Sequence, residues 1–169
     1  CLSMPQDVES ESYDYPDYFF KKRIWRIDRR PPAENAVGIA VSKILNSKKP
    51  MIICGGGVRY SKAYEELKDF AAKFSIPFGE TQSGKGGISW EFDWNLGGIG
   101  LTGTSSANIT AQNADLIIAI GTRLMDFTTC SKWLFQNPRV EFISINIDVK
   151  DAVKMDSFPV VSDAKEALA

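Results

Sequence analysis

Short apolar runs that alternate with segments of helical periodicity constrain the fold of this chain most strongly. Residues 51–54 form one such run between Pro50 and three consecutive glycines, and the strand expected at residues 115–120 is apolar throughout after Asp115 and is followed by Gly121. Apolar runs without polar alternation are typical of strands buried on both faces of a parallel sheet. The two runs therefore predict the centre of an α/β fold.

The segments around these runs predict the remaining elements. Apolar residues recur at helical spacing from residue 34 toward Pro50, and again in residues 61–74 with Ser61 as the N-cap. Further elements are expected as strands at 76–79, 142–148 and 158–161, a helix at 105–113, and a helix that opens at Asp163. This order predicts a doubly wound, mainly parallel sheet flanked by helices, a Rossmann-like α/β fold with right-handed crossovers.

The strand expected at residues 142–148 alternates in character. Its isoleucines are predicted to face one way and its polar residues the other: Ile143, Ile145 and Ile147 against Ser144, Asn146 and Asp148. We interpret this segment as a strand with one polar side.

The N-terminal part of the chain differs from the rest. Residues 1–8 predict the end of a strand from a preceding domain followed by a turn, because Pro5 removes a backbone donor. Residues 9–32 are dense in charges and aromatics and predict an interdomain linker whose aromatics pack on this domain or on a neighbour. Residues 33–169 then form the domain proper. Because the chain starts at Cys1 without Met, we expect it to come from a longer protein.

Composition argues against several classes of function. The chain has 20 Lys plus Arg and 21 Asp plus Glu, so it lacks the field that nucleic acid or an anionic membrane would require. It also lacks a long apolar span and an export signal, which predicts a cytoplasmic protein. Three widely spaced cysteines predict reduced structural thiols, and the absence of histidine removes the commonest proton-transfer and metal-binding side chain.

The glycine triplet is the first candidate site. Gly55, Gly56 and Gly57 follow a strand and precede a helix, where backbone N–H groups can approach a pyrophosphate. The triplet is neither Gly-x-Gly-x-x-Gly nor a P-loop, since position 60 is Tyr and no Gly-Lys-Ser/Thr follows. A tight turn that binds nothing is an equally good interpretation.

Three charged residues at expected strand ends complete the candidate site. Arg123 and Asp126 follow the strand at 115–120, where they could clamp a phosphate and a ribose or pair with each other. Asp148 ends another strand, where doubly wound folds keep an acid for a ribose or adenine edge, although a turn residue is the simpler interpretation. The long glycine-rich stretch at 81–103 is a further segment expected to bind or contact something.

Several motifs together resemble a known family. They are the glycine triplet at 55–57, residues 81–86 (Thr-Gln-Ser-Gly-Lys-Gly), residues 121–123 (Gly-Thr-Arg), and residues 145–148 (Ile-Asn-Ile-Asp). From about residue 32 onward, the chain resembles the central domain of thiamine-diphosphate enzymes related to acetolactate synthase. The resemblance implies a DHS-like NAD/FAD-binding fold between a pyrimidine-binding and a diphosphate-binding domain, in a homo-oligomer.

Within this family the motifs are most similar to a hydrolase branch that opens a six-membered ring in myo-inositol breakdown by C–C bond hydrolysis. The resemblance implies thiamine diphosphate and Mg²⁺ bound outside this chain, which by itself would then carry no catalytic residue. Flavin-binding relatives hold the ADP part of FAD with residues that match Gly55–Gly57, Arg123, Asp126 and Asp148. This chain has Asn146 where they have an acid and Thr102 where they often have histidine, so a vestigial or unoccupied nucleotide site is expected.

Overall fold

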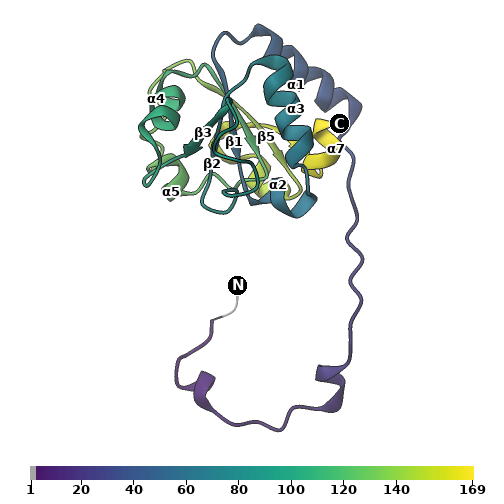
Figure 1. Cartoon of the computed structure of the whole chain (residues 1–169). Coiled ribbons are helices and arrows are strands. Elements are labelled where there is room, and N and C mark those ends of the chain that lie inside the picture. Colours follow the sequence, from purple (N-terminus) through teal and green to yellow (C-terminus); the bar gives the residue numbers. More distant parts are fainter. Residues whose placement is uncertain (1–2) are drawn as a thin grey trace.

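A computed structural model describes residues 3–169 of the chain. It places one parallel sheet between two layers of helices, with the N-terminal segment extending away from the domain (Figure 1). The sheet has six strands in the order β3-β2-β1-β4-β5-β6, and every neighbouring pair is parallel. The predicted doubly wound α/β fold is therefore confirmed.

The strands are short and their central members are wholly apolar. Their bounds are β1 Pro50–Cys54, β2 Phe78–Glu80, β3 Asn95–Gly98, β4 Leu116–Ile120, β5 Glu141–Asn146 and β6 Phe158–Val161. β1 and β4 lie at the centre of the sheet, in register from Pro50 opposite Leu116 to Cys54 opposite Ile120. Burial on both faces explains why their sequences show no polar alternation.

The helices cover both faces of the sheet. Their bounds are α1 Glu34–Asn46, α2 Gly56–Ser61, α3 Tyr64–Phe74, α4 Ser105–Asn113, α5 Asp126–Thr129, α6 Val149–Ala152 and α7 Ala164–Leu168, with 3₁₀ turns η1 Val8–Ser10, η2 Asp17–Phe20 and η3 Lys154–Asp156. α1, α2, α3 and α7 pack on one face through residues such as Leu67 and Ala71, whereas α4 packs on the other through Ala107 and Ala111. None of the helices in residues 3–169 is long and apolar enough to cross a membrane.

Three local predictions differ from the structure. Ser61 ends α2 instead of capping the next helix, and its hydroxyl donates to the Gly57 carbonyl at 2.8 Å. The glycine-rich stretch contains the edge strand β3, which was missed because Gly97 and Gly98 are poor strand residues. The polar side of β5 is covered, since Ser144 and Asn146 are buried.

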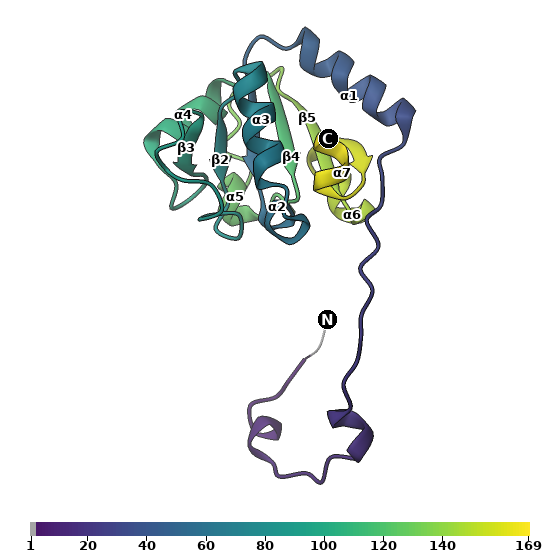
Figure 2. The ribbon, with the colours of Figure 1, turned by 45° about the vertical axis from the view of Figure 1, so that its right-hand side comes forward.

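Most of the N-terminal segment lies apart from the domain. Cys1 and Leu2 lie outside the described residues; residues 3–5 have no regular secondary structure and residues 6–7 form a turn. The linker aromatics are exposed and do not cover the α/β domain, from which the segment stands away in both ribbon views (Figure 2). The linker returns to the domain near its end, where the Asp163 N–H donates to the Arg30 carbonyl at 2.9 Å.

Candidate functional site

The carboxyl ends of β1, β4 and β5 meet at a groove of about 410 Å³. Backbone and side chains from the ends of four strands and the segments that follow them line it: Gly56, Gly57, Tyr60, Thr81, Gln82, Ser83, Gly121, Thr122, Arg123, Met125, Phe127, Thr128, Asn146 and Asp151. This is the edge at which ligands bind in doubly wound sheets. The groove therefore contains Gly56, Gly57 and Arg123 of the predicted site, whereas Gly55, Asp126 and Asp148 lie outside its lining.

The glycine triplet forms the start of α2 and packs directly on the end of β4. The Gly55 N–H donates to the Ile120 carbonyl at 2.8 Å, and the Gly57 N–H donates to the Gly121 carbonyl at 2.9 Å. A Cβ on Gly57 would stand 2.5 Å from the Gly121 Cα. Two of the three amides that a pyrophosphate would need are thus engaged within the protein, and the glycines permit the close backbone approach.

The two charged residues after β4 do not form the expected pair. Arg123 is exposed at the mouth of the groove, and Asp126 is exposed as the first residue of α5. Within residues 3–169 neither side chain takes part in an ion pair. Arg123 is therefore the one cation that lines the groove in this part of the chain.

The polar side chains at and just after the end of β5 form hydrogen bonds to backbone groups of the protein. The Asn146 side-chain amide donates to the Thr122 carbonyl at 3.0 Å, and its oxygen accepts the Asp148 N–H at 3.1 Å. Asp148 itself is the N-cap of α6, where its carboxylate accepts the Lys150 N–H at 2.8 Å. The structure thus shows Asp148 as a capping residue outside the groove.

The groove also includes residues that the sequence analysis did not single out as site residues. Tyr60, Phe127 and Asp151 follow three different strands and reach the groove only because the strand ends converge there. No local motif marks them. Thr81, Gln82 and Ser83 belong to the glycine-rich stretch at 81–103, whose composition and length predict a binding or contact segment.

A buried pair of titratable groups lies behind the groove, at the ends of β1 and β2. Burial raises the pKa of the Cys54 thiol to about 12, with a smaller contribution from Glu80. Burial also raises the pKa of the Glu80 carboxyl, which is 4% exposed and whose Oε1 atom has no hydrogen-bond partner within the described residues. Neither group lines the groove.

A smaller cavity of about 250 Å³ continues the same edge toward β6. The end of the linker forms one of its walls through residues 27–29. Arg29 fixes this strap, because its guanidinium donates to the Asp163 carboxylate at 2.6 Å and to the Tyr60 carbonyl at 3.2 Å. Residues 27–29 therefore close one side of the smaller cavity, beside the groove.

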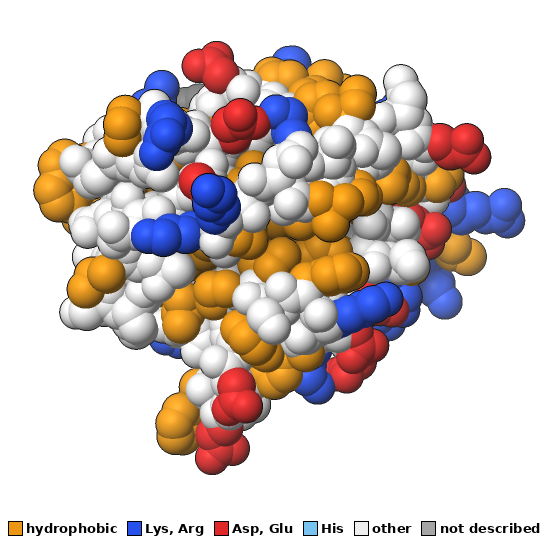
Figure 3. All heavy atoms as spheres, turned by 90° about the horizontal axis from the view of Figure 1, so that it is seen from above, with side chains coloured by type: hydrophobic (Ala, Val, Ile, Leu, Met, Phe, Trp, Pro, Cys, Tyr) orange, Lys and Arg blue, Asp and Glu red, His pale blue; other side chains and the backbone are white. Residues whose placement is uncertain are grey.

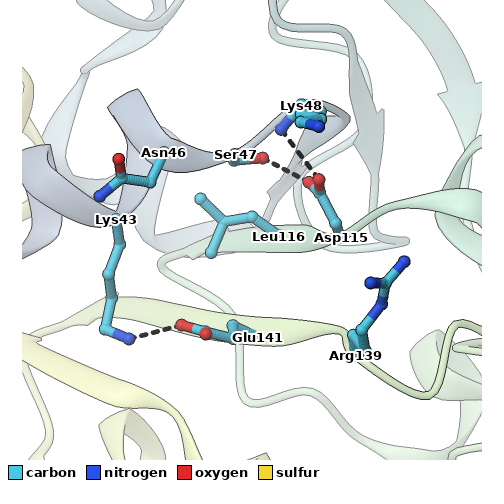
Figure 4. Close-up of a pocket in the computed structure, with 8 residues that line it drawn as sticks. All are labelled: Lys43, Asn46, Ser47, Lys48, Asp115, Leu116, Arg139 and Glu141. Atoms are coloured by element: carbon cyan, nitrogen blue, oxygen red, sulfur yellow. Dashed lines mark hydrogen bonds and ion pairs between the residues drawn. The ribbon is translucent and has the colours of Figure 1, made fainter.

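A polar pocket of about 450 Å³ lies at the opposite, amino end of the strands (Figure 4). The Asp115 carboxylate accepts hydrogen bonds there from the Ser47 hydroxyl and from the N–H groups of Lys48, at 2.8 Å, and Lys49, at 2.9 Å. Glu141 is paired with Lys43 at 2.5 Å. Seen from above, hydrophobic and charged side chains mix on this side of the molecule (Figure 3). The carboxylates of Asp115 and Glu141 are thus both bound by partners in α1 or in the turn that follows it, and these contacts join α1 to the sheet.

The chain offers no clustered metal ligands in its described part. Among residues 3–169 no group of three or more His, Cys, Asp or Glu side chains is placed to hold a metal ion. The groove presents backbone groups, hydroxyls, amides, one arginine and the carboxylate of Asp151, which is paired with Lys154 at 2.7 Å. This arrangement suits binding and positioning better than proton transfer.

A family model and similar sequences both place the chain among thiamine pyrophosphate enzymes. Residues 37–169 match the model of the thiamine pyrophosphate enzyme, central domain. The chain is 60% identical over 167 residues to the 3D-(3,5/4)-trihydroxycyclohexane-1,2-dione hydrolase of Clostridium tetani, and 57% identical to the hydrolase of the same name in Bacillus thuringiensis. Each match covers 99% of this chain and 26% of the relative. The chain thus spans about a quarter of the length of these relatives.

Solved structures show the same fold at low sequence identity. Benzoylformate decarboxylase from Polynucleobacter necessarius aligns with a TM-score of 0.64 and 20% identity, over 88% of this chain and 30% of that one. An enzyme of Mycobacterium smegmatis described as a putative thiamin diphosphate-dependent enzyme aligns with a TM-score of 0.67 and 16% identity, over 86% and 28% of the two chains.

Proposed function

The chain belongs to the family of thiamine pyrophosphate enzyme central domains, and on this premise we propose that it is the structural central domain of a ring-opening hydrolase. The parent enzyme would open 3D-(3,5/4)-trihydroxycyclohexane-1,2-dione by C–C bond hydrolysis in myo-inositol degradation. The observation that carries this proposal is 60% identity over 99% of the chain to a hydrolase named for that substrate.

The side chains at the groove favour a structural role for this domain over a catalytic one. The sequence contains no histidine, and the three groups whose pKa values burial raises, Cys54, Tyr64 and Glu80, do not line the groove. A general acid or base must reach the proton that it transfers. We therefore assign bond cleavage to other parts of the parent polypeptide.

Thiamine diphosphate supplies an electron-accepting centre when bound, and the diphosphate is commonly held through a divalent cation. The described residues provide no cluster of metal-ligating side chains. We propose that thiamine diphosphate and Mg²⁺ bind outside this chain, between the flanking pyrimidine- and diphosphate-binding domains. This chain would hold those domains at a fixed spacing in a cytoplasmic homo-oligomer.

The alternative is a working FAD or ADP site at the groove, as in acetolactate-synthase-like enzymes. Its residues fit such a ligand poorly. Gly55 and Gly57 donate their N–H groups to β4 and its end, Asp148 caps α6, and Asn146 donates to the Thr122 carbonyl. Of the residues expected to hold the nucleotide, Arg123 lines the groove as a cation, whereas Gly55, Gly57 and Asp148 are engaged within the protein. We therefore propose that the nucleotide site is vestigial.

The test compares this 169-residue chain with the full-length parent. We expect the parent to hydrolyse the cyclic dione only with thiamine diphosphate and Mg²⁺, and the isolated chain to show no turnover under the same conditions. Turnover by the isolated chain would refute the structural assignment. Calorimetry of the chain with FAD and with ADP tests the groove separately, and micromolar binding abolished by Arg123→Ala would favour the alternative.

A further inference from the structure

The groove at the ends of β1, β4 and β5 has one positive charge that no acid in the described part of the chain balances. Arg123 lines its mouth and forms no ion pair among residues 3–169. Asp151 also lines the groove, but Lys154 pairs with its carboxylate at 2.7 Å. A ligand with a single negative charge suits this lining, because a guanidinium can hold a carboxylate through two parallel N–H bonds.

Two buried hydroxyls of the lining each have a proton to donate. The Thr81 hydroxyl accepts the Gly84 N–H at 3.2 Å, and the Thr122 hydroxyl accepts the Leu124 N–H at 3.3 Å. A hydroxyl can also donate one hydrogen bond, and neither of these does so within residues 3–169. Thr81 is 5% exposed and Thr122 is 6% exposed, and buried polar groups are normally paired. The groove is where a ligand could accept both protons.

The rest of the lining suits a short carbon chain that carries hydroxyls. Gln82 and Ser83 are exposed on the groove just after β2, and Thr128 adds a third polar side chain from α5. Met125 and Phe127 supply apolar surface beside them. A polyhydroxylated chain can exchange hydrogen bonds with the polar group and place its C–H bonds against the apolar one.

The charge of the groove favours such a small acid over a diphosphate. Two of the glycine amides that a pyrophosphate would need, those of Gly55 and Gly57, donate to carbonyls at the end of β4. One arginine then remains for a group that carries more than one negative charge. The volume of about 410 Å³ lies within the usual range for small-molecule sites. A monocarboxylate of about six carbons therefore fits both the size and the charge.

The reaction proposed for the parent enzyme forms an acid of this class. Water adds to one carbonyl carbon of the cyclic 1,2-dione, and the bond between the two carbonyl carbons breaks. The first carbon keeps the oxygen of the water and becomes a carboxylic acid, while the electron pair of the broken bond takes up a proton at the second carbon, which becomes an aldehyde. One water is consumed without an oxidant or reductant. The substrate is uncharged, and the product, once ionised, carries one negative charge and three hydroxyls.

We propose that the groove binds the ring-opened product class, a six-carbon polyhydroxy monocarboxylate. Arg123 holds the carboxylate, and the Thr81 and Thr122 hydroxyls donate to oxygens of the ligand. The uncharged dione has no group for Arg123 to hold, so the groove distinguishes the product from the substrate. The choice of ligand rests on the proposed function, whereas the preference for one negative charge rests on the groove alone.

Titration calorimetry of the 169-residue chain at constant ionic strength tests the site. The probes are D-gluconate, an open-chain six-carbon polyhydroxy carboxylate, and D-sorbitol, the corresponding chain without the carboxylate. Gluconate should bind at least about tenfold more tightly than sorbitol, because hydrogen bonds to a charged group are the stronger ones. ADP, which tests the nucleotide alternative, should bind more weakly than gluconate.

Two pairs of variants identify the groove as the place of binding. Arg123→Gln should weaken gluconate binding by at least about tenfold, whereas Arg139→Gln, at an exposed position in the pocket at the opposite end of the strands, should leave it unchanged. Thr122→Val should weaken gluconate binding, and Thr122→Ser, which keeps the hydroxyl, should restore it. Thermal unfolding of each variant confirms that it is folded.

Four results would overturn the proposal. They are no gluconate binding at about 10 mM, equal affinity for sorbitol, equal affinity of the Arg123→Gln chain, and tighter binding of ADP than of gluconate. Failure of the proposed reaction has a different signature, since it would appear as a parent enzyme that does not hydrolyse the dione. Calorimetry on this chain does not depend on that turnover, so the two outcomes are separable.

Discussion

The Cα of Gly121 lies 2.5 Å from the point where a Cβ on Gly57 would stand. Gly121 also has a φ of +61°, a conformation that L side chains rarely adopt. These two glycines let the start of α2 meet the end of β4 through backbone alone. Both glycines line the groove.

Gly57→Ala should destabilise the domain, because its methyl group would collide with backbone that cannot move independently of the sheet. We expect a loss of about 1–3 kcal/mol in the free energy of unfolding, the usual cost of overpacking. Urea denaturation measures it. The control is Gly38→Ala, where a Cβ meets nothing within 4 Å inside α1. That change should stabilise the domain by about 0.5–1 kcal/mol, and an equal loss in both variants would contradict the prediction.

Glu80→Gln should remove a pH dependence of stability. Burial raises the pKa of this carboxyl above its ordinary value of 4.5, so the folded state binds the proton more tightly than the unfolded state. The free energy of unfolding therefore falls as the pH rises from 4.5 through the raised pKa. Denaturation across this range should show a shallower slope for Glu80→Gln. Glu91→Gln, at an exposed position, should keep the wild-type slope.

Asp115→Asn should destabilise the domain near neutral pH and much less in acid. Burial alone would raise the pKa of Asp115, but hydrogen bonds from the Ser47 hydroxyl and the Lys48 and Lys49 N–H groups outweigh it and lower the pKa below 3.8. The stability from this carboxylate is present above pH 3.8 and is lost as the pH falls through the lowered pKa.

The expected cost of Asp115→Asn at neutral pH is about 1–3 kcal/mol, typical of hydrogen bonds to a charged group. Thermal unfolding at neutral and acidic pH measures it. Asp69→Asn, at an exposed position of α3, provides the matched control and should change little at either pH. A cost for Asp115→Asn that did not shrink in acid would contradict this role of the carboxylate.

Arg29→Ala should release the strap from the domain without unfolding it. The pair with Asp163 is partly exposed, so we expect a cost of about 1 kcal/mol or less in global stability. The local effect should be larger. Hydrogen exchange of the Asp163 N–H, which donates to the Arg30 carbonyl, should speed up. Arg30→Ala keeps that carbonyl and should leave the exchange rate near the wild-type value.

Much of the fold could be predicted because it depends on neighbouring residues. The unbroken apolar run at 116–120 predicted β4, and the helix expected at 105–113 has the same bounds as α4. β3 was missed because its pairing with β2 comes from tertiary contacts, with a register shift between Phe78 and Glu80. A four-residue edge strand with two glycines carries too weak a local signal.

The candidate site was predicted less completely, because several of its residues have a role that depends on distant partners. The triplet at 55–57 follows a strand and begins a helix as predicted, yet the N–H groups of Gly55 and Gly57 donate to Ile120 and Gly121 at the end of β4. Asp148 follows a strand as expected and caps α6. Sequence spacing located these residues, but their hydrogen-bond partners decide what remains free to meet a ligand.

The sequence by itself determined the α/β class, the order of the main strands and helices and the family, because apolar periodicity and short motifs are local properties of the chain. Only the tertiary structure decided that Gly57 is paired with Gly121, that one oxygen of the buried Glu80 has no hydrogen-bond partner among residues 3–169, and that Arg29 at the end of the linker pairs with Asp163. Burial and hydrogen bonding depend on which segments converge, and the convergence of distant strand ends is not encoded in any single stretch.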